Sequence, residues 1–459
     1  MTGDSTTSGR ELLDWMTAQR WYGDKSRTIA AYEHQPVTTV ELGGETVAIS
    51  AERVEFTEGG QSTYLATRAI GDSRREATSS AAFLAWLAAG FAERRTLPAK
   101  DMEGAHLVWT SLDAAAVDWT VLPGRLIAGE QSNSSIIYGD AAIVKLFRKL
   151  QPGINPDSEI VAFLTERTTY RHVPTYLGGL TLRFDDNREA IELAAVQGFV
   201  ANDGDCWRWL PGALAAASDN GEDLLLDQVG LLGRRTGELH AALATGSDLP
   251  AFSPEIYTAD EARDVAARIR NEVAVTCEAL RSQEALADDV SAHLNATLGM
   301  RIGDGSVLTG LPRIRVHGDY HLGQVLRAND DFVIIDFEGE PSRSMAERRQ
   351  KHAPLKDVAG MLRSLDYAVS SASHDAGSSD QSRLIAWGRL AETRFVDGYR
   401  SAVASAPIQL VPDDPDRFSL ALDLYVIEKA VYEVRYELDN RPDWLHIPLD
   451  GLRRIADST

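Results

Sequence analysis

The chain is poor in cysteine, in basic residues relative to acidic ones, and in long apolar runs. Two cysteines in 459 residues are too few for a disulfide framework, so we expect a reducing cytoplasm. No uninterrupted apolar stretch approaches the roughly 18 residues of a membrane span. Residues 1–7 have neither the basic region nor the apolar run of a signal peptide. The sequence therefore predicts a cytoplasmic protein with no membrane partner.

The charge balance is acidic. Lys and Arg number 46 and Asp and Glu 68, for a formal net charge of −22. Broad binding to nucleic acid or to an anionic membrane requires a basic surface, so we expect no nucleic-acid partner. An anionic ligand must instead meet local positive groups. The length exceeds the ~250–300 residues that one hydrophobic core usually serves, which predicts two or three domains.

The hydrophobic pattern changes along the chain from mixed to helical. Helical spacing predicts helices over 9–22 and 79–93. From about residue 205 the pattern is mostly helical, and the small-residue stretch 371–382 is typical of a solvated loop. Alternating or β-rich segments predict strands over 38–42, 47–50, 62–66, 119–122, 135–138 and 142–147. The chain is thus expected to be α+β.

The most informative segment is 316–324, Val-His-Gly-Asp-Tyr-His-Leu-Gly-Gln, which is followed by an apolar strand ending at Asp336. Phosphoryl transfer from ATP needs a carboxylate that orients the acceptor hydroxyl and two oxygen ligands that hold Mg²⁺ on the phosphates. Asp319 can supply the first, and Gln324 and Asp336 the other two. Protein kinases have this spacing, with Asn in place of Gln324. The alternative is a buried turn beside an unrelated strand end, but three spaced elements agree here rather than one.

Lys145 lies inside an apolar strand, where an ammonium group requires a partner. A kinase pairs such a lysine with a glutamate on the next helix, and Glu159 begins a helical run here. The polar hairpin tip 129–135 can contact phosphates through its N–H groups and through hydroxyls such as those of Ser132 and Ser134. Alternatively, Lys145 is a strand-edge residue with its ammonium in water.

An adenine site is expected where the apolar strand 194–201 enters the turn 202–205. In a bilobal kinase the base lies against such a hinge and bonds its backbone groups. Gln197, Phe199 and Val200 are the candidates. Many strand-to-turn transitions have this pattern, and the position between the lysine strand and the helical half favours the hinge.

Motifs along nearly the whole chain resemble those of the maltokinase family, kin to aminoglycoside phosphotransferases and the eukaryotic-like protein kinases. The resemblance extends to actinobacterial glucosamine kinases related to maltokinases. The motifs are Gln19-Arg20-Trp21-Tyr22 with Lys25, the segments 130–135, 145–148, 153–159, 317–324 and 336–341, and Arg441-Pro442-Asp443-Trp444.

The resemblance implies a bilobal protein-kinase-like fold. Residues 1–90 would form an N-terminal cap subdomain, 91–201 an intermediate subdomain completing the N-lobe, and 202–459 a helical C-lobe. It also implies ATP and Mg²⁺ as cofactors and a free sugar as substrate. Carried over by position, the roles are an ion pair for Lys145 and Glu159, catalysis for Asp319, and metal binding for Gln324 and Asp336.

The acceptor pocket is expected on C-lobe helices, with 428–441 as the richest segment. Glu433 and Glu437 lie one turn apart, a spacing at which like charges repel unless a cation or sugar hydroxyls compensate. The alternative is a solvent face neutralised by Lys429, Arg435 and Arg441. The expected sugar contacts are Asp319, His321, Tyr432, Glu433, Glu437, Asp439, Arg441 and Trp444.

Asp439 favours an aminosugar, because maltokinases carry Arg or Asn where this chain has a carboxylate. A charge-assisted bond to an ammonium is worth ~1.5–3 kcal/mol, which favours glucosamine, converted to glucosamine 6-phosphate. If Asp439 only pairs with Arg441, maltose remains, converted to maltose 1-phosphate. An aminoglycoside phosphotransferase and a pseudokinase are further alternatives. The long N-terminal cap argues against the first, and the intact set of Lys145, Asp319, Gln324 and Asp336 against the second.

Overall fold

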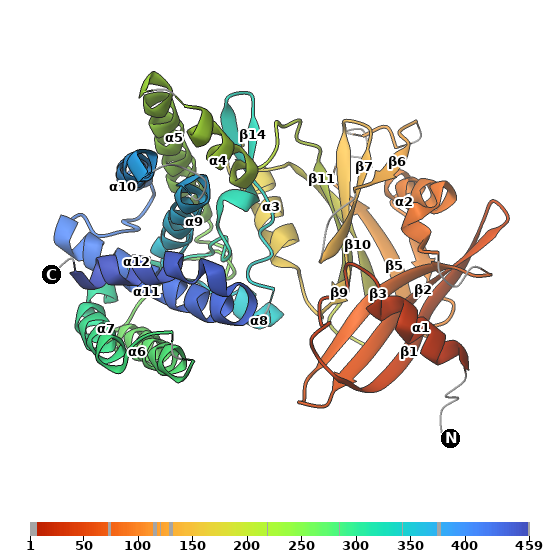
Figure 1. The fold of residues 1–459 in the computed structure, drawn as a ribbon. Coiled ribbons are helices and arrows are strands. Elements are labelled where there is room, and N and C mark those ends of the chain that lie inside the picture. The colour runs from red at the N-terminus through yellow and green to blue at the C-terminus, as the bar shows by residue number, and fades with distance from the viewer. Residues whose placement is uncertain are drawn as a thin grey trace. The chain divides into compact units, whose positions relative to one another are not determined.

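The protein, seen in a computed structural model, forms two compact units (Figure 1). The first consists of residues 1–165 and 174–201, and the second of 166–173 and 202–459. The structure describes residues 7–71, 75–112, 117–119, 121–127, 132–217, 219–283, 285–341, 343–373 and 378–457.

A four-stranded antiparallel sheet, in the order β1-β2-β3-β9, opens the first unit. Trp15 of helix α1 (Thr7–Thr17) is buried in one cluster with Tyr64 of the sheet. The helix expected over 9–22 ends early, because the rings of Trp21 and Tyr22 turn into this cluster and lie 6.0 and 4.9 Å from that of Tyr64. The strands are β1 (Ile29–Leu42), β2 (Glu45–Phe56), β3 (Gln61–Ala69) and β9 (Lys149–Leu150).

A seven-stranded antiparallel sheet, in the order β4-β5-β10-β11-β8-β7-β6, forms the rest of the first unit. Helix α2 (Ala81–Glu93) begins at Ser80, whose side chain accepts the N–H of Phe83, and its apolar face is buried in the core of this sheet. Helix α3 (Pro156–Arg167) follows β9. The strands are β4 (Thr96–Pro98), β5 (Ala105–Ser111), β6 (Gly124–Leu126), β7 (Asn133–Tyr138), β8 (Ala142–Phe147), β10 (Tyr176–Phe184) and β11 (Ile191–Gly198).

The strand predicted over 119–122 is wrong. Its described residues are in turns or irregular. The Trp119 ring lies 5.3 Å from the rings of Phe91 and Tyr138, so its apolar character serves the core rather than a strand ladder.

The second unit is mainly helical (Figure 1). Helix α5 (Asp219–Leu243) packs along α10 (Ser378–Val403), and α9 (Leu355–Ser373) against α11 (Pro415–Asn440). Part of the loop expected over 371–382 is helical, because α9 extends to Ser373 and α10 begins at Ser378. The remaining elements are α4 (Cys206–Ala216), α6 (Ala259–Ser282), α7 (Asp288–Ile302), α8 (Met345–Arg348), α12 (His446–Asp457), β12 (Glu255–Ile256), β13 (Pro312–Arg313), β14 (Val325–Ala328) and β15 (Asp331–Ile334).

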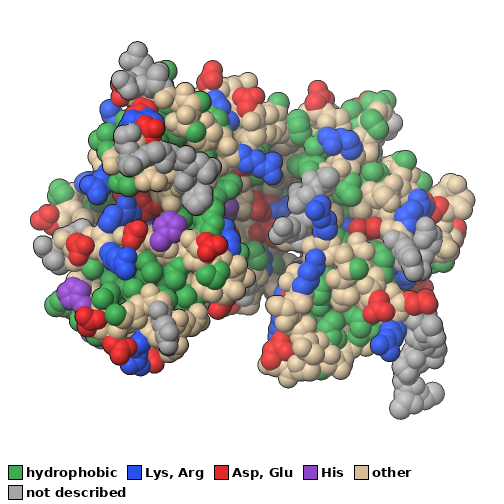
Figure 2. Space-filling model, in the orientation of Figure 1, with side chains coloured by type: hydrophobic (Ala, Val, Ile, Leu, Met, Phe, Trp, Pro, Cys, Tyr) green, Lys and Arg blue, Asp and Glu red, His purple; other side chains and the backbone are tan. Residues whose placement is uncertain are grey.

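The described surface is mixed in charge. On the face shown in Figure 2, Lys and Arg side chains are scattered among Asp and Glu over each unit. Within the part of the chain that the structure describes, no helix is both long and apolar enough to cross a bilayer.

Candidate active site

The segment that bears Asp319 is anchored in the second unit by the buried carboxylate of Asp357 on α9. The backbone N–H groups of His317 and Gly318 donate to the two carboxylate oxygens of Asp357 at 2.7 and 3.0 Å. Gly318 has a φ of 86°, a conformation that glycine adopts without steric cost. The turn before Asp319 is therefore fixed by α9 as well as by its own sequence.

Asp357 is 2% exposed and is held by His240 of α5. The Nε2 atom of His240 lies 3.1 Å from an Asp357 oxygen, and its Nδ1 lies 3.1 Å from the Tyr399 hydroxyl. Burial by itself raises the pKa of Asp357, but the hydrogen bond and charge of His240, with the hydrogen bond from the Gly318 N–H, outweigh it and keep the pKa below its ordinary value. Asp357 was not among the residues predicted from the sequence, although an acidic residue in an apolar helical run was a usable signal.

His317 links the Asp319 turn to the segment before Asp336. Its Nε2 lies 2.9 Å from the carbonyl oxygen of Ile335. Since a carbonyl only accepts, Nε2 carries the proton. The other ring nitrogen, Nδ1, can then accept the N–H of Asp319 at 3.4 Å. The predicted catalytic and metal-binding residues are thus connected through one ring.

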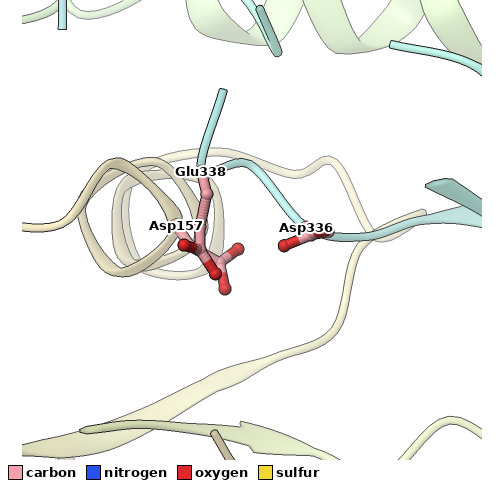
Figure 3. Close-up of side chains that lie close together, drawn as sticks. All are labelled: Asp157, Asp336 and Glu338. Atoms are coloured by element: carbon pink, nitrogen blue, oxygen red, sulfur yellow. The ribbon is translucent and has the colours of Figure 1, made fainter. Parts of the chain in front are cut away.

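Gln324 and Asp336 lie together, as a shared metal site would require. The Gln324 Nε2 donates to Asp336 at 2.9 Å, which leaves the amide oxygen for a ligand. Asp336 has a φ of 67°, and its side chain and that of Glu338 offer carboxylate oxygens within 4.8 Å of each other (Figure 3). Such oxygen donors suit Mg²⁺. We did not predict Glu338, although an Asp-x-Glu sequence after a strand was a usable signal.

His321 has a structural contact within the same segment. Its Nδ1 accepts the N–H of Gly323 at 3.0 Å and caps the short turn Leu322–Gln324. Burial lowers the pKa of His321, so the ring stays neutral near neutral pH. The ring therefore helps to position Gln324.

A polar cavity opens beside Asp319 in the second unit. Gly360 allows α9 to pack closely against the backbone of Tyr320 at this cavity, because a Cβ atom at position 360 would lie 2.6 Å from the carbonyl oxygen of Tyr320. Closely spaced donors and acceptors of both signs suit a sugar, whose hydroxyls do both. The charged side chains in its wall are Asp319, Glu272, Glu340, Asp357, Glu428, Arg343, Lys356, Lys429 and Arg435.

Of the residues predicted on α11, Tyr432 lines this cavity. Glu433 and Glu437 are engaged elsewhere. Glu433 accepts a 2.8 Å bond from Arg363, and Glu437 accepts bonds of 2.9 Å from Tyr367 and 2.7 Å from Arg441. Cations and a hydroxyl of the protein therefore compensate the charges of Glu433 and Glu437. Their spacing on the helix thus does not indicate a bound sugar.

The end of α11 forms a separate cluster. The Trp444 ring stacks on that of Tyr367 at 6.2 Å, and the Arg441 guanidinium lies 5.1 Å from the Trp444 ring. Asp439 is exposed, and among the described residues Arg441 bonds Glu437 rather than Asp439. The alternative considered for Asp439, a pairing with Arg441, is therefore absent from the described part of the chain. The wall of the cavity beside Asp319 does not include His321, Glu433, Glu437, Asp439, Arg441 or Trp444.

In the first unit, the lysine of β8 has a carboxylate partner that we did not predict. The Lys145 ammonium lies 3.4 Å from Asp157, which is 1% exposed at the start of α3. The Gln197 side chain donates to the same carboxylate at 3.1 Å. The pairing of Lys145 with Glu159 stays a prediction beside this observed contact.

Some of the groups that were expected to contact the nucleotide, at the hinge and at the hairpin tip, form hydrogen bonds within the first unit. The N–H of Phe199 donates to the Ala141 carbonyl at 3.0 Å, so it is engaged; Val200 follows it, half-buried, after β11. The hydroxyl of Ser134 is buried and accepts a 2.8 Å bond from Arg148. This bond uses a lone pair of the hydroxyl oxygen and leaves its O–H as a donor, so the phosphate contact of Ser134 stays a prediction. Ser132 is exposed, and residues 129–131 of the tip lie outside the described residues.

Comparison with known proteins identifies one matching family and two similar kinases. Residues 124–339 match the model of a phosphotransferase enzyme family. A glucosamine kinase of Streptacidiphilus jiangxiensis is 31% identical over 347 residues, covering 71% of either chain. A glucosamine kinase of Mycolicibacterium smegmatis is 31% identical over 343 residues, covering 72% of this chain and 79% of that one.

Solved structures confirm the predicted fold class. A glucosamine kinase structure superposes with a TM-score of 0.70 at 22% identity, covering 97% of this chain and 99% of that one. A glucosamine kinase in complex with glucosamine, ADP and inorganic phosphate superposes with a TM-score of 0.68 at 23% identity, covering 99% and 100%. At these identities the likeness concerns the kinase-like fold.

Proposed function

The chain belongs to the phosphotransferase enzyme family, together with the two glucosamine kinases it matches, and from this premise we propose that it is an ATP- and Mg²⁺-dependent kinase converting glucosamine to glucosamine 6-phosphate. The observation that carries this proposal is the polar cavity beside Asp319, which places a carboxylate next to space for a hydroxylated acceptor. The relatives' activity supports the choice of sugar.

In the proposed reaction Asp319 accepts a hydrogen bond from the 6-hydroxyl of the sugar and orients it. The hydroxyl oxygen forms a bond to the γ-phosphorus of ATP, the bond from that phosphorus to the bridging oxygen of ADP breaks, and the hydroxyl proton passes to Asp319. Gln324 and Asp336, with Glu338, would hold Mg²⁺, which when bound offsets charge on the phosphate oxygens. Asp357 keeps Asp319 in place through the backbone before it.

The amine of glucosamine needs a carboxylate, and the cavity offers one in Glu340. Its side chain pairs with Arg343 of the same wall, is 12% exposed, and lies close enough to Lys429 and Tyr432 to influence the pKa of both groups. A charge-assisted bond of ~1.5–3 kcal/mol separates glucosamine from glucose by about tenfold to a hundredfold. Asp439, proposed from sequence for the same role, is exposed at the end of α11.

A comparison of the two variants decides between these carboxylates. Glu340→Gln should reduce kcat/KM for glucosamine by about tenfold or more while changing kcat/KM for glucose little. Asp439→Asn serves as the comparison variant. If Asp439→Asn alone abolishes the preference, the amine is read at the end of α11 and not in the cavity.

The function itself is tested by ATP consumption with glucosamine, maltose, glucose and kanamycin as acceptors. We expect glucosamine to be the preferred acceptor, and Asp319→Asn to lower kcat by about 10²–10⁴-fold with ATP binding kept. Efficient use of maltose without glucosamine would make the protein a maltokinase. Nucleotide binding without turnover would make it a pseudokinase. An Asp319→Asn variant with more than about a tenth of the wild-type kcat would overturn the role of Asp319.

A further inference from the structure

We propose that Lys429 is a positioning residue that holds the Asp319 carboxylate in the orientation used for phosphoryl transfer. This inference rests on the proposed kinase function of the same site. The Lys429 ammonium lies 3.4 Å from Oδ1 of Asp319 and reaches it from α11, at a separation of 110 residues in sequence. Among the described residues no other hydrogen bond to this carboxylate occurs. Oδ1 is thus engaged, and Oδ2 remains for the acceptor hydroxyl.

Asp319 needs such a partner, because its backbone anchors do not fix its carboxylate. The contacts of Asp357 and His317 are to the main chain of the turn. The terminal torsion of an aspartate is broad rather than confined to narrow wells, so the carboxylate plane can rotate on a fixed backbone. An ammonium on one oxygen limits that rotation. It also offsets repulsion between the carboxylate and the phosphates of ATP.

Lys429 is itself fixed by a row of alternating charges that crosses from α9 to α11. Asp366 pairs with Arg363, a residue 1% exposed. The Nε atom of Arg363 donates to Glu433 at 2.8 Å, and Glu433 lies one turn from Lys429 on α11 and attracts its ammonium. The row of charges therefore runs from Asp366 and Arg363 on α9, through Glu433 and Lys429 on α11, to Asp319. This assigns Glu433 to the support of Lys429 rather than to the sugar.

The ammonium form of Lys429 is favoured by its surroundings. Burial alone lowers the pKa of Lys429, but Asp319, Glu433 and Glu340 outweigh burial and hold it above its ordinary value. The ring of Tyr432 lies 5.3 Å from the ammonium nitrogen, within the range of a cation–π contact. Lys429 therefore stays charged over the working pH range and is restrained in position.

The test compares Lys429→Met with Lys429→Arg. We expect Lys429→Met to lower kcat about 10- to 100-fold, the effect of losing one charge-assisted hydrogen bond. KM for glucosamine and for Mg·ATP should change by less than about threefold, because the lysine acts through Asp319. Lys429→Arg keeps the charge and should recover most of the lost kcat. Arg453→Met, which removes an exposed cation of α12, is the control and should behave as wild type.

A double variant shows whether Lys429 acts through Asp319. In an Asp319→Asn background, Lys429→Met should lower kcat no further, since the group it positions is gone. The double variant removes both charges of the pair, so it remains informative if Lys429→Met alone fails to fold.

The proposal would be overturned if the effects of Lys429→Met and Asp319→Asn on kcat multiply in the double variant. It would also be overturned if Lys429→Met changes only KM, or leaves kcat within about twofold of wild type. If the acceptor assay identifies a sugar other than glucosamine, the same comparison is made with that sugar. Failure of the glucosamine proposal is then distinguishable from failure of the role of Lys429.

Discussion

Replacing Asp357 with asparagine tests whether the Asp319 turn is held from α9. Asparagine has nearly the same shape but is neutral, and one of its two polar atoms is a donor. The carboxylate accepts the N–H groups of His317 and Gly318 at 2.7 and 3.0 Å and a 3.1 Å bond from His240. An asparagine oxygen can accept from one backbone N–H, while its NH₂ group faces the other. One buried backbone donor is therefore left without an acceptor.

The expected cost follows from these contacts. A buried donor without a partner costs about 1–3 kcal/mol. Breaking a buried pair typically costs ~3–5 kcal/mol in total, and the lower end applies here because asparagine still accepts one of the bonds. We therefore expect a loss of about 3 kcal/mol. In a unit of this size, one kcal/mol lowers Tm by about 2–4 °C, so the transition should fall by about 6–12 °C.

Thermal unfolding followed by circular dichroism, together with kcat measured well below the transition, checks this prediction. Asp450→Asn is the control, because Asp450 forms a surface pair with Arg453, has a side chain 61% exposed, and should cost less than about 1 kcal/mol. The Asp357 variant should also lose kcat as the turn loosens. A Tm within about 2 °C of the control, with kcat unchanged, would refute the anchoring role.

Three further predictions concern the metal, the lysine of β8 and pH. Asp336→Ala should abolish Mg²⁺-dependent nucleotide binding in calorimetry, whereas Gln324→Ala should weaken it less because a neutral amide contributes less than a carboxylate; equal affinities in both variants would contradict the site. Asp157→Asn should raise KM for ATP, since Asp157 is a partner of the lysine, and Glu159→Gln tests the pairing predicted from the sequence; an unchanged KM in either variant would contradict the role of that carboxylate. Burial raises the pKa of Glu192 from 4.5 to about 7. Between these values the folded chain binds the proton that the unfolded chain has lost, so stability falls as pH rises. Glu192→Gln should therefore flatten the stability of the first unit between about pH 4.5 and 7 in denaturant titrations, and an unchanged slope would exclude this group as the cause.

The sequence by itself predicts those features that are set by residues close together in the chain. Asp319, Gln324 and Asp336 lie on one short turn-and-hairpin segment, so their chain connections bring Gln324 and Asp336 within hydrogen-bond distance. Apolar periodicity identified α2, β7 and β8 because burial on one face imposes a repeat on the sequence. The fold class followed from the same patterns together with the motifs.

Only the tertiary structure decided which distant charges meet. Packing of α11 against α9 places Lys429 beside Asp319, although 110 residues separate them, and packing of α9 brings Asp357 beneath the turn. Asp157 meets Lys145 because a helix turns its side chains by about 100° per residue, and the docking of α3 selects the face that it presents. Ser134 is turned inward by Arg148 for a related reason, since a buried guanidinium requires acceptors wherever the fold offers them. A local pattern fixes the spacing of chemical groups, whereas their partners depend on how the elements pack.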